Sequence, residues 1–131
     1  MPSYQGSCHC GRIRFEIDAE IDHVTRCDCS LCRKKNALMT KVSEDAFRFL
    51  GDREFLGLYE WNTRTAKHYF CRVCGIYTFH RKRIDPTMFG VNAACLDDLD
   101  LDTIPVVPVD GIGMSSRPRD TLASLDQTPF P

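Results

Sequence analysis

The sequence has no long hydrophobic run: none of its 131 residues lies in a stretch near the roughly 18 uninterrupted apolar residues that a transmembrane helix needs. Its first ten residues, MPSYQGSCHC, also lack the basic segment followed by an apolar one that marks a secretory signal. We therefore expect a cytoplasmic protein without a membrane partner.

An excess of charge of one sign is lacking as well. Lys and Arg number 17 against 18 Asp and Glu, which gives a net charge of -1. Sequence-independent nucleic-acid binding works through a basic surface that releases counterions, so we do not expect a nucleic-acid partner. The sequence shows no internal repeat, and it does not indicate the oligomeric state.

Short segments with the pattern of β-strands are abundant. In GRIRFEID, the apolar Ile13, Phe15 and Ile17 alternate with charged residues, a period of two that is typical of a half-buried strand. Six further short runs are rich in aromatic or β-branched residues and are separated by turn-forming ones. They lie at residues 37–43, 46–51, 55–61, 66–70, 76–80 and 88–95. The pattern predicts a mainly β fold of antiparallel sheets with little helix, and only residues 95–104 look helical.

Prolines are concentrated near the end of the sequence, because five of the seven follow Thr103. Proline restricts the backbone and removes an amide donor. We therefore expect a zinc-binding domain over residues 1–104 and a Pro-rich tail over residues 105–131 that packs on this domain or trails from it.

Cysteine is frequent, with eight residues in the chain. Disulfides are rare in a reducing cytosol, so metal ligation is the better explanation. Cys71 and Cys74 have the two-residue gap and the following glycine of a zinc knuckle, and Cys8 and Cys10 can supply two more sulfurs. Two plus two makes a closed tetrahedral site, which predicts a structural zinc that links the start of the chain to its middle.

Three further cysteines, Cys27, Cys29 and Cys32, fall within six residues. Three protein ligands with an open fourth position are the arrangement of a catalytic zinc. Two alternatives stay open: Cys95 closes this site, or the three thiols bind no metal. Cys95 itself stands alone and is expected to be a small buried side chain.

Four blocks of the sequence carry a family resemblance: SCHCGRIRFE, CDCSLCRKKNA, YFCRVCGIYTFH and VNAACLDD. Together they resemble the glutathione-dependent formaldehyde-activating family, with the centromere protein V group as relatives. The resemblance implies twisted antiparallel sheets linked by a structural zinc on Cys8, Cys10, Cys71 and Cys74. It also implies a second zinc on Cys27, Cys29 and Cys32, where a thiol substrate enters. The implied activity is the addition of formaldehyde to glutathione, which is a carbon-sulfur lyase reaction in reverse.

Such a site suits this chemistry, because zinc deprotonates the sulfur that it binds and a thiol attacks a carbonyl as the thiolate. Several thiolates on one zinc leave the site negatively charged, so nearby cations are needed. Two basic clusters could provide them or meet the carboxylates of a glutathione-like ligand. They are Arg33, Lys34 and Lys35, and Arg81, Lys82 and Arg83.

Three histidines are candidates for proton transfer. His9, His68 and His80 could act as acids or bases near neutral pH, although a histidine beside a zinc knuckle is more often a hydrogen-bonding neighbour. Asn92 is a further candidate for substrate binding, and a backbone hydrogen bond at a strand end is the more ordinary role.

Three kinds of function are compatible with these residues. The first is a zinc-dependent carbon-sulfur lyase that joins a small aldehyde to a thiol, or reverses that addition. The second is a non-catalytic, zinc-stabilised binding module for a protein or a thiol metabolite. The third is a redox or metal-handling protein that uses the thiols directly.

Overall fold

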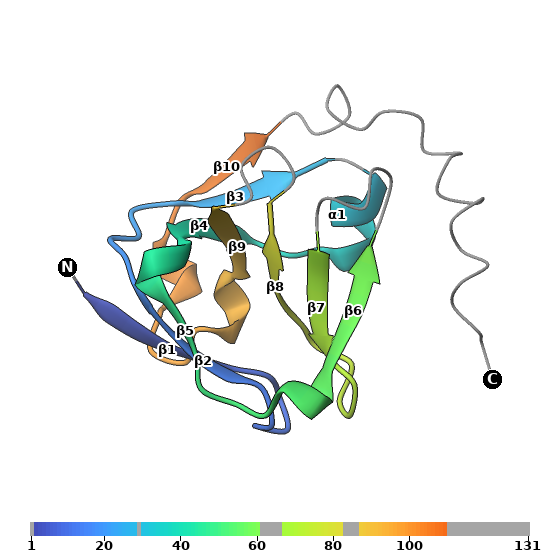
Figure 1. The fold of residues 1–131 in the computed structure, drawn as a ribbon. Helices are drawn as coiled ribbons and strands as arrows, with labels where there is room; N and C mark the ends of the chain where they lie inside the picture. The colour runs from blue at the N-terminus through green and yellow to red at the C-terminus, as the bar shows by residue number, and fades with distance from the viewer. Residues whose placement is uncertain (1, 29, 61–66, 83–86, 110–131) are drawn as a thin grey trace.

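Two β-sheets make up the fold in the computed structural model, which describes residues 2–28, 30–60, 67–82 and 87–109 (Figure 1). One sheet has three strands in the order β1-β2-β5, and the other has seven in the order β10-β3-β4-β9-β8-β7-β6. The strands are β1 (Ser3–Ser7), β2 (Arg14–Asp18), β3 (Val24–Cys27), β4 (Met39–Ser43), β5 (Phe47–Phe49), β6 (Leu56–Glu60), β7 (Lys67–Cys71), β8 (Tyr77–Arg81), β9 (Met88–Asn92) and β10 (Val106–Val109). The prediction of a mainly β fold is confirmed.

The three-stranded sheet shows why the alternating segment forms a strand. Ile13, Phe15 and Ile17 are all fully buried, as their period of two predicts. On the opposite face, Arg48 of β5 donates hydrogen bonds to Glu16 and Asp18 of β2. Ion pairs between strands therefore stabilise the exposed face of this sheet, and apolar packing stabilises its buried face.

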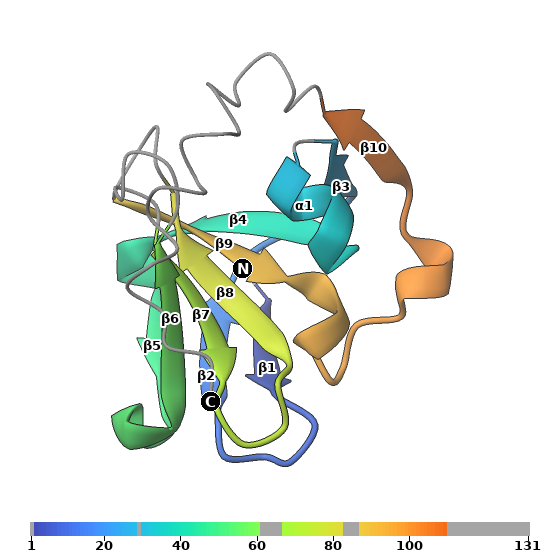
Figure 2. The ribbon, with the colours of Figure 1, turned by 90° about the vertical axis from the view of Figure 1, so that its right-hand side faces the viewer.

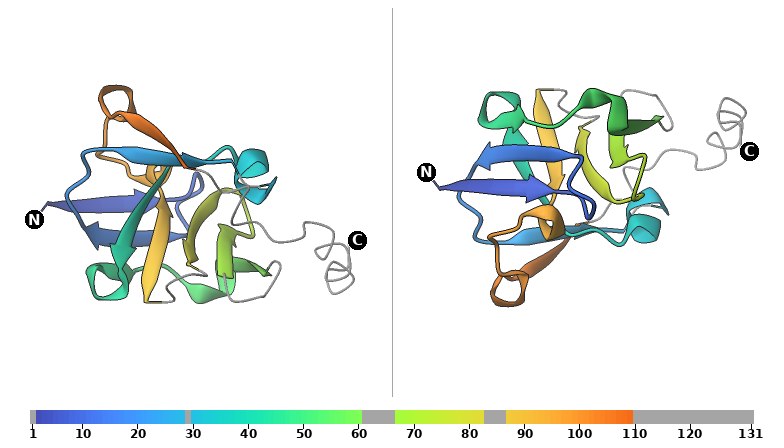
Figure 3. Two further views of the ribbon diagram at one scale, coloured as in Figure 1. Left: turned by 90° about the horizontal axis from the view of Figure 1, so that it is seen from above. Right: turned by 90° about the horizontal axis from the view of Figure 1, so that it is seen from below.

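The seven-stranded sheet is antiparallel except at one edge. Strands β6 to β9 follow one another as a meander, and β4 then pairs with β9. Strand β10 instead pairs in parallel with β3, because the chain comes back to the edge of the sheet at the same end at which β3 begins. The views from above and below show β1 and β2 of the small sheet running across β4 and β9 of the large one (Figure 3).

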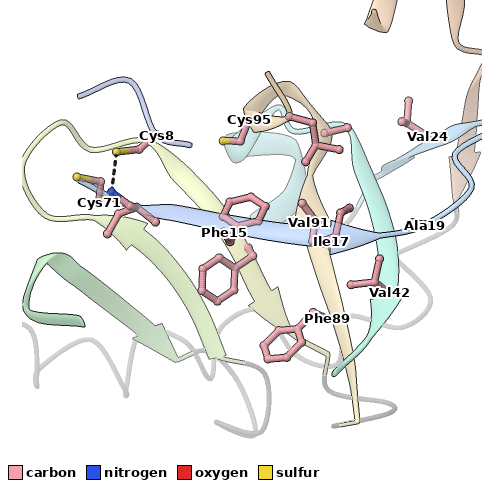
Figure 4. Packing of buried hydrophobic residues seen from close by; sticks show 14 residues of the cluster. Cys8, Phe15, Ile17, Ala19, Val24, Val42, Cys71, Phe89, Val91 and Cys95 are labelled. Carbon is pink, nitrogen blue, oxygen red and sulfur yellow. Dashed lines mark hydrogen bonds between the residues drawn. The ribbon is translucent and has the colours of Figure 1, made fainter. Parts of the chain in front are cut away.

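The core lies between the two sheets and is rich in phenylalanine. The Phe47 ring lies 4.5 Å from that of Phe89 and 4.7 Å from that of Phe79, measured between ring centroids, and Phe15 stacks on Phe47 at 5.4 Å. Burying one such ring contributes about 1.5–3 kcal/mol. Figure 4 shows the buried residues of the core, Phe15 and Phe89 among them, with Cys8 and Cys71 at one end, so the first cysteine group is continuous with the core.

One short α-helix, α1 (Ser30–Lys35), interrupts the β-strands of the described residues, and the sequence pattern did not predict it. Its last turn carries Arg33, Lys34 and Lys35, which suits the negative end of a helix dipole. Asn36 ends it with φ 53°, and the Asn36 amide donates to the Cys32 carbonyl at 2.9 Å. The segment from 95 to 104, which looked helical, instead holds parts of two 3₁₀ turns, Ala93–Cys95 and Leu101–Thr103.

The predicted tail begins inside the sheet. Residues 106–109, which the sequence analysis placed in the tail, form β10, while residues 110–131 lie outside the described residues. Across the described parts of the chain, the structure contains no helix with the length and apolar character required to cross a membrane.

Candidate functional site

Two loops bring four cysteines together at one end of the molecule. Cys8 and Cys10 lie in the loop between β1 and β2, and Cys71 and Cys74 lie where β7 turns into β8. All four sulfurs lie within 4.8 Å of one another, and Cys10 Sγ is 3.6 Å from both Cys8 Sγ and Cys71 Sγ. A zinc ion with four sulfurs at about 2.3 Å has sulfur–sulfur separations of about 3.8 Å, so the geometry of this four-cysteine cluster suits a metal ion.

Backbone amides point at the sulfurs of the four-cysteine cluster. The Ile13 amide donates to Cys8 Sγ at 3.3 Å, and the amides of Val73 and Cys74 donate to Cys71 Sγ at 3.4 Å. The turn that follows Cys74 depends on Gly75, whose φ of 80° is in the left-handed region that other residues rarely adopt. These are the features expected of a zinc knuckle.

The thiols of the four-cysteine cluster differ in their pKa values. Hydrogen bonds from the Arg12 backbone and side chain lower the pKa of Cys10 to about 6. Burial raises the pKa of Cys71 to about 11, because a buried thiolate loses its solvation. A bound metal ion would override this second effect, since a coordinating thiol is deprotonated outright.

Two of the three clustered cysteines open onto one cavity at the other end of the molecule. Cys27 ends β3 and Cys32 lies in α1, and both line a cavity of about 660 Å³, the cysteine cavity. The cavity is also lined by Arg26, Asp28, Arg33, Pro108 and Val109. Cys29 lies outside the described residues, so a metal site shared by all three cysteines stays a prediction.

The walls of the cysteine cavity are fixed by contacts between three segments. The Arg26 side chain donates to Asn36 Oδ1 at 2.5 Å, which joins the end of β3 to the end of α1. The Asp28 amide donates to the Val109 carbonyl at 3.2 Å, which joins the same loop to β10. These contacts hold Cys27 and Cys32 on one cavity although they come from different elements.

Sequence reasoning missed four of the seven residues that line this cavity. Arg26 and Asp28 flank Cys27 directly, so their nearness to that cysteine was visible in the sequence. Pro108 and Val109 gave no such signal, because a Pro-rich segment does not indicate that it will pair in parallel with a distant strand.

The two predicted basic clusters are used differently. Arg33 lines the cysteine cavity, and the Lys35 Nζ lies 2.6 Å from His68 Nδ1. The Arg81 side chain instead forms an ion pair with Glu44 at 2.9 Å. Lys34 is exposed on α1, Lys82 follows β8, and Arg83 lies outside the described residues.

The remaining candidates divide into buried and exposed groups. His68 is buried and stacks on His80 with ring centroids 4.9 Å apart, whereas His9 is exposed in the loop between Cys8 and Cys10. The Asn92 side chain donates to the Tyr77 carbonyl and accepts from the Ala94 amide, which is the strand-end role anticipated for it.

Cys95 lies beside the four-cysteine cluster and belongs to the same hydrophobic core as Cys8. Its side chain is 5% exposed, as expected of a small buried residue. Burial raises the pKa of Cys95 to about 12, and the nearby sulfur of Cys8 adds to the effect. The thiol donates to the Tyr77 carbonyl at 3.5 Å, so it is a buried, hydrogen-bonded neutral group.

The domain is mainly β, with a cysteine cluster able to hold a metal ion at one end and a cavity lined by cysteine and arginine at the other. These features define a class of thiol-rich proteins that can hold a metal ion. The comparisons with known proteins narrow that class. The sequence model of the family described as "Glutathione-dependent formaldehyde-activating enzyme" matches residues 3–109. The chain belongs to this family, and the resemblance noted in its cysteine blocks is confirmed.

A solved structure supports the same conclusion. The crystal structure of a Rhodobacter sphaeroides protein is similar to this chain, with 40% sequence identity and a TM-score of 0.74. The match covers 79% of this chain and 97% of that one. At this identity the two proteins share the family fold.

Proposed function

We propose that the protein is a zinc-dependent carbon-sulfur lyase-like enzyme that joins a small aldehyde such as formaldehyde to a thiol such as glutathione, or reverses that addition. The thiol would enter at a three-cysteine zinc site made of Cys27, Cys29 and Cys32. Family membership supports the substrates. The observation that carries the proposal is that Cys27 and Cys32, from two different elements, line one cavity.

A second zinc would be structural, held by Cys8, Cys10, Cys71 and Cys74. The donor set supports this assignment, because four sulfurs within 4.8 Å of one another, with amides donating to two of them, leave no room for a substrate as a further ligand. At the cysteine cavity, zinc would supply a lowered thiol pKa and a fixed position for the incoming sulfur.

The charges around the cysteine cavity complement a glutathione-like thiol. Such a molecule carries two carboxylates and one ammonium group. The lining residues include two arginines, Arg26 and Arg33, and one acidic residue, Asp28. Guanidinium groups bind carboxylates through paired hydrogen bonds, and a cavity of about 660 Å³ is within the usual range for small-molecule sites.

Binding in the cavity would orient the substrate for addition. With its carboxylates on the two arginines, the thiol group would point toward Cys27 and Cys32. An encounter of two solutes then becomes a positioned step, which is a large source of rate enhancement. The side chains of Pro108 and Val109 would exclude water from that side of the cavity.

Zinc content and adduct formation test the proposal together. We expect two zinc ions per chain in the wild-type protein and one in Cys32→Ala. Exchange NMR should show that the wild-type protein accelerates interconversion of glutathione, formaldehyde and their S-hydroxymethyl adduct, whereas Cys32→Ala should not. The control is Lys34→Ala, which changes an exposed residue of the same helix.

Substrate recognition is tested with a second thiol. Arg26→Ala should weaken glutathione binding about tenfold, the loss of about 1.4 kcal/mol for one charged hydrogen-bonded contact. It should leave 2-mercaptoethanol, which has no carboxylate, unaffected. If the wild-type protein binds glutathione without accelerating the exchange, the non-catalytic binding module is the correct function instead.

A further inference from the structure

A row of ring side chains crosses the large sheet on the face that α1 contacts. Tyr59 of β6 is directly opposite His68 of β7, and His68 is directly opposite His80 of β8. Directly opposite residues on antiparallel strands point to the same face. The two imidazoles stack with ring centroids 4.9 Å apart, and the Tyr59 ring lies 6.5 Å from that of His68.

A β-bulge adds Tyr77 to this face. Tyr69 pairs with Phe79 while its neighbour Phe70 pairs with Tyr77, so β8 has one extra residue, Thr78, at this point. Phe70 shares a face with His68, two residues before it, and its partner Tyr77 therefore shares the face of His80. The Tyr77 hydroxyl lies 2.5 Å from His80 Nδ1, a hydrogen bond that a regular strand would not allow.

Lys35 connects this group of rings to α1. Its Nζ lies 2.6 Å from His68 Nδ1 and 3.5 Å from the centroid of the Tyr77 ring. Lys35 follows Cys32 by three positions in the same helix, and residues three apart lie on the same side of a helix. The Lys35 side chain thus extends from the turn of α1 that carries Cys32 to the buried imidazole of His68, which stacks on the half-buried imidazole of His80.

The His80 ring packs against Gly90, which has no side chain. A Cβ added to Gly90 would lie 2.3 Å from His80 Cε1, so the imidazole rests on the backbone of β9. Together with the hydrogen bond to Tyr77, this contact fixes the ring. We call Lys35, His68, Tyr77 and His80 the lysine–imidazole cluster.

The positive charge of the lysine–imidazole cluster resides on Lys35. Burial, reinforced by the charge of Lys35, lowers the pKa of His68 to about 2 and that of His80 to about 3, so both are neutral at physiological pH. Among the described residues, the other titratable or charged groups that face the cluster are Tyr59, whose pKa is raised by burial, and Lys82, whose charge acts on His80.

We propose that Lys35 is the proton donor to the aldehyde oxygen during addition of the thiol, and that His68, Tyr77 and His80 are positioning residues that hold its ammonium group in place. This inference rests on the proposed function. It gives a role to a group of polar side chains, the buried His68 among them, that neither the cysteine cavity nor the four-cysteine cluster uses.

The step is balanced in atoms and charge. The sulfur–carbon bond forms as the carbonyl π bond breaks, and the electron pair of that bond moves to oxygen. The oxygen takes a proton from the Lys35 ammonium, and the proton that the thiol released restores the ammonium. In the reverse direction the neutral Lys35 amine removes the hydroxyl proton as the sulfur–carbon bond breaks.

Arginine distinguishes a proton donor from a simple positive charge, because it is cationic but does not release a proton in proteins. We expect both Lys35→Arg and Lys35→Met to lower kcat for adduct formation about 100-fold, a typical contribution of general acid catalysis. Zinc content and glutathione affinity should stay as in the wild type in both variants, and the thermal melt should stay so in Lys35→Arg, which keeps a donor for the buried His68. Lys34→Arg, at the exposed neighbouring position, is the control.

Two further measurements separate positioning from general destabilisation. His68→Asn keeps a hydrogen-bond acceptor for Lys35 and should retain more activity than His68→Phe, which removes it. Nitrogen-15 NMR should show a changed His68 Nδ1 resonance in Lys35→Met without substrate, because the hydrogen bond to that nitrogen is lost.

The outcomes of these experiments distinguish a failure of this inference from a failure of the proposed function on which it rests. Wild-type kcat in Lys35→Arg would overturn the role of Lys35 and leave the enzyme assignment intact. Equal activity in His68→Asn and His68→Phe would overturn the positioning role. A zinc-loaded wild-type protein that binds glutathione but gives no rate acceleration would overturn the proposed enzyme, and the proton donor with it.

Discussion

The four-cysteine cluster and the cysteine cavity hold their sulfurs in different ways. In the cluster, two loops at one end of the sheets bring four sulfurs within 4.8 Å of one another, and Cys8 and Cys71 are buried in the core. In the cavity, Cys27 and Cys32 are half-buried and line an open volume at the other end, beside α1 and β10 (Figure 2). The first arrangement closes around an ion, whereas the second leaves access to a ligand.

The surroundings of the two cysteine groups also differ: backbone amides surround the cluster, whereas charged residues line the cavity. Backbone amides point at Cys8 and Cys71, so the chain itself satisfies these sulfurs. The cavity instead has two arginine residues, Arg26 and Arg33, in its lining. Fixed amides suit a permanent ligand set, and charged side chains suit a substrate that arrives and leaves.

Removal of one cysteine from each group is the sharpest test of this comparison. Cys71→Ala should lower the free energy of unfolding by about 5 kcal/mol or more, because structural zinc binding contributes about 10 kcal/mol in small zinc peptides. Cys32→Ala should lower it by no more than about 1 kcal/mol, as for substitutions outside a core. Urea unfolding of both variants measures the difference, and equal losses would mean that both groups are structural.

Acid should destabilise the protein through the two imidazoles of the lysine–imidazole cluster. Burial places the pKa of His68 at about 2 and that of His80 at about 3, whereas an unfolded histidine has a pKa of about 6.5. Because the folded-state pKa is the lower one, this stability is fully present above about pH 6.5 and is lost as the pH falls toward 3.

The expected slope is at most about 1.4 kcal/mol per pH unit for each histidine. His68→Asn and His68→Phe both remove one titrating group, so both should flatten the dependence of the unfolding free energy on pH between 6 and 4. Urea titrations at fixed zinc content measure the slopes. A slope identical to that of the wild type in both variants would show that His68 titrates normally.

The sequence predicted the regions where local pattern decides the structure. Alternation placed Ile13, Phe15 and Ile17 in the core, because the period of a strand is independent of its partners. The spacing of Cys71 and Cys74, with a glycine after them, indicated the knuckle for a similar reason: the turn is formed by neighbouring residues alone.

The parts of the structure that the sequence did not predict depend on contacts between residues far apart in the chain. β10 carries two prolines at or beside it, Pro105 and Pro108, and lines the cavity only because it pairs in parallel with β3. Helix α1 is too short to show a hydrophobic period, and it ends at Asn36 with a side chain bonded to Arg26 of another element. The lysine–imidazole cluster likewise depends on a bulge that no local pattern around Thr78 indicates.

The smallest predicted effect compares two left-handed residues, one from each end of the molecule. Gly75, after the knuckle, has φ 80° and Asn36, after α1, has φ 53°. A Cβ on Gly75 would meet no atom within 4 Å, so the cost of Gly75→Ala comes from backbone conformation alone and should be about 1–2 kcal/mol. Asn36→Gly relieves the same strain but loses the bond to Arg26, so the two effects should cancel to within about 0.5 kcal/mol.

Zinc retention and glutathione binding show whether Gly75 and Asn36 each stabilise the four-cysteine cluster or the cysteine cavity. Gly75→Ala strains the turn that presents Cys74 and should speed the loss of one zinc ion to a chelator. Asn36→Gly should leave that rate unchanged and weaken glutathione binding instead, because Arg26 loses the partner that holds it at the cavity. Thermal melts, chelator kinetics and glutathione titrations of the two variants measure these effects. Faster zinc loss in Asn36→Gly than in Gly75→Ala would reverse the assignment of a structural ion to one end and a substrate site to the other.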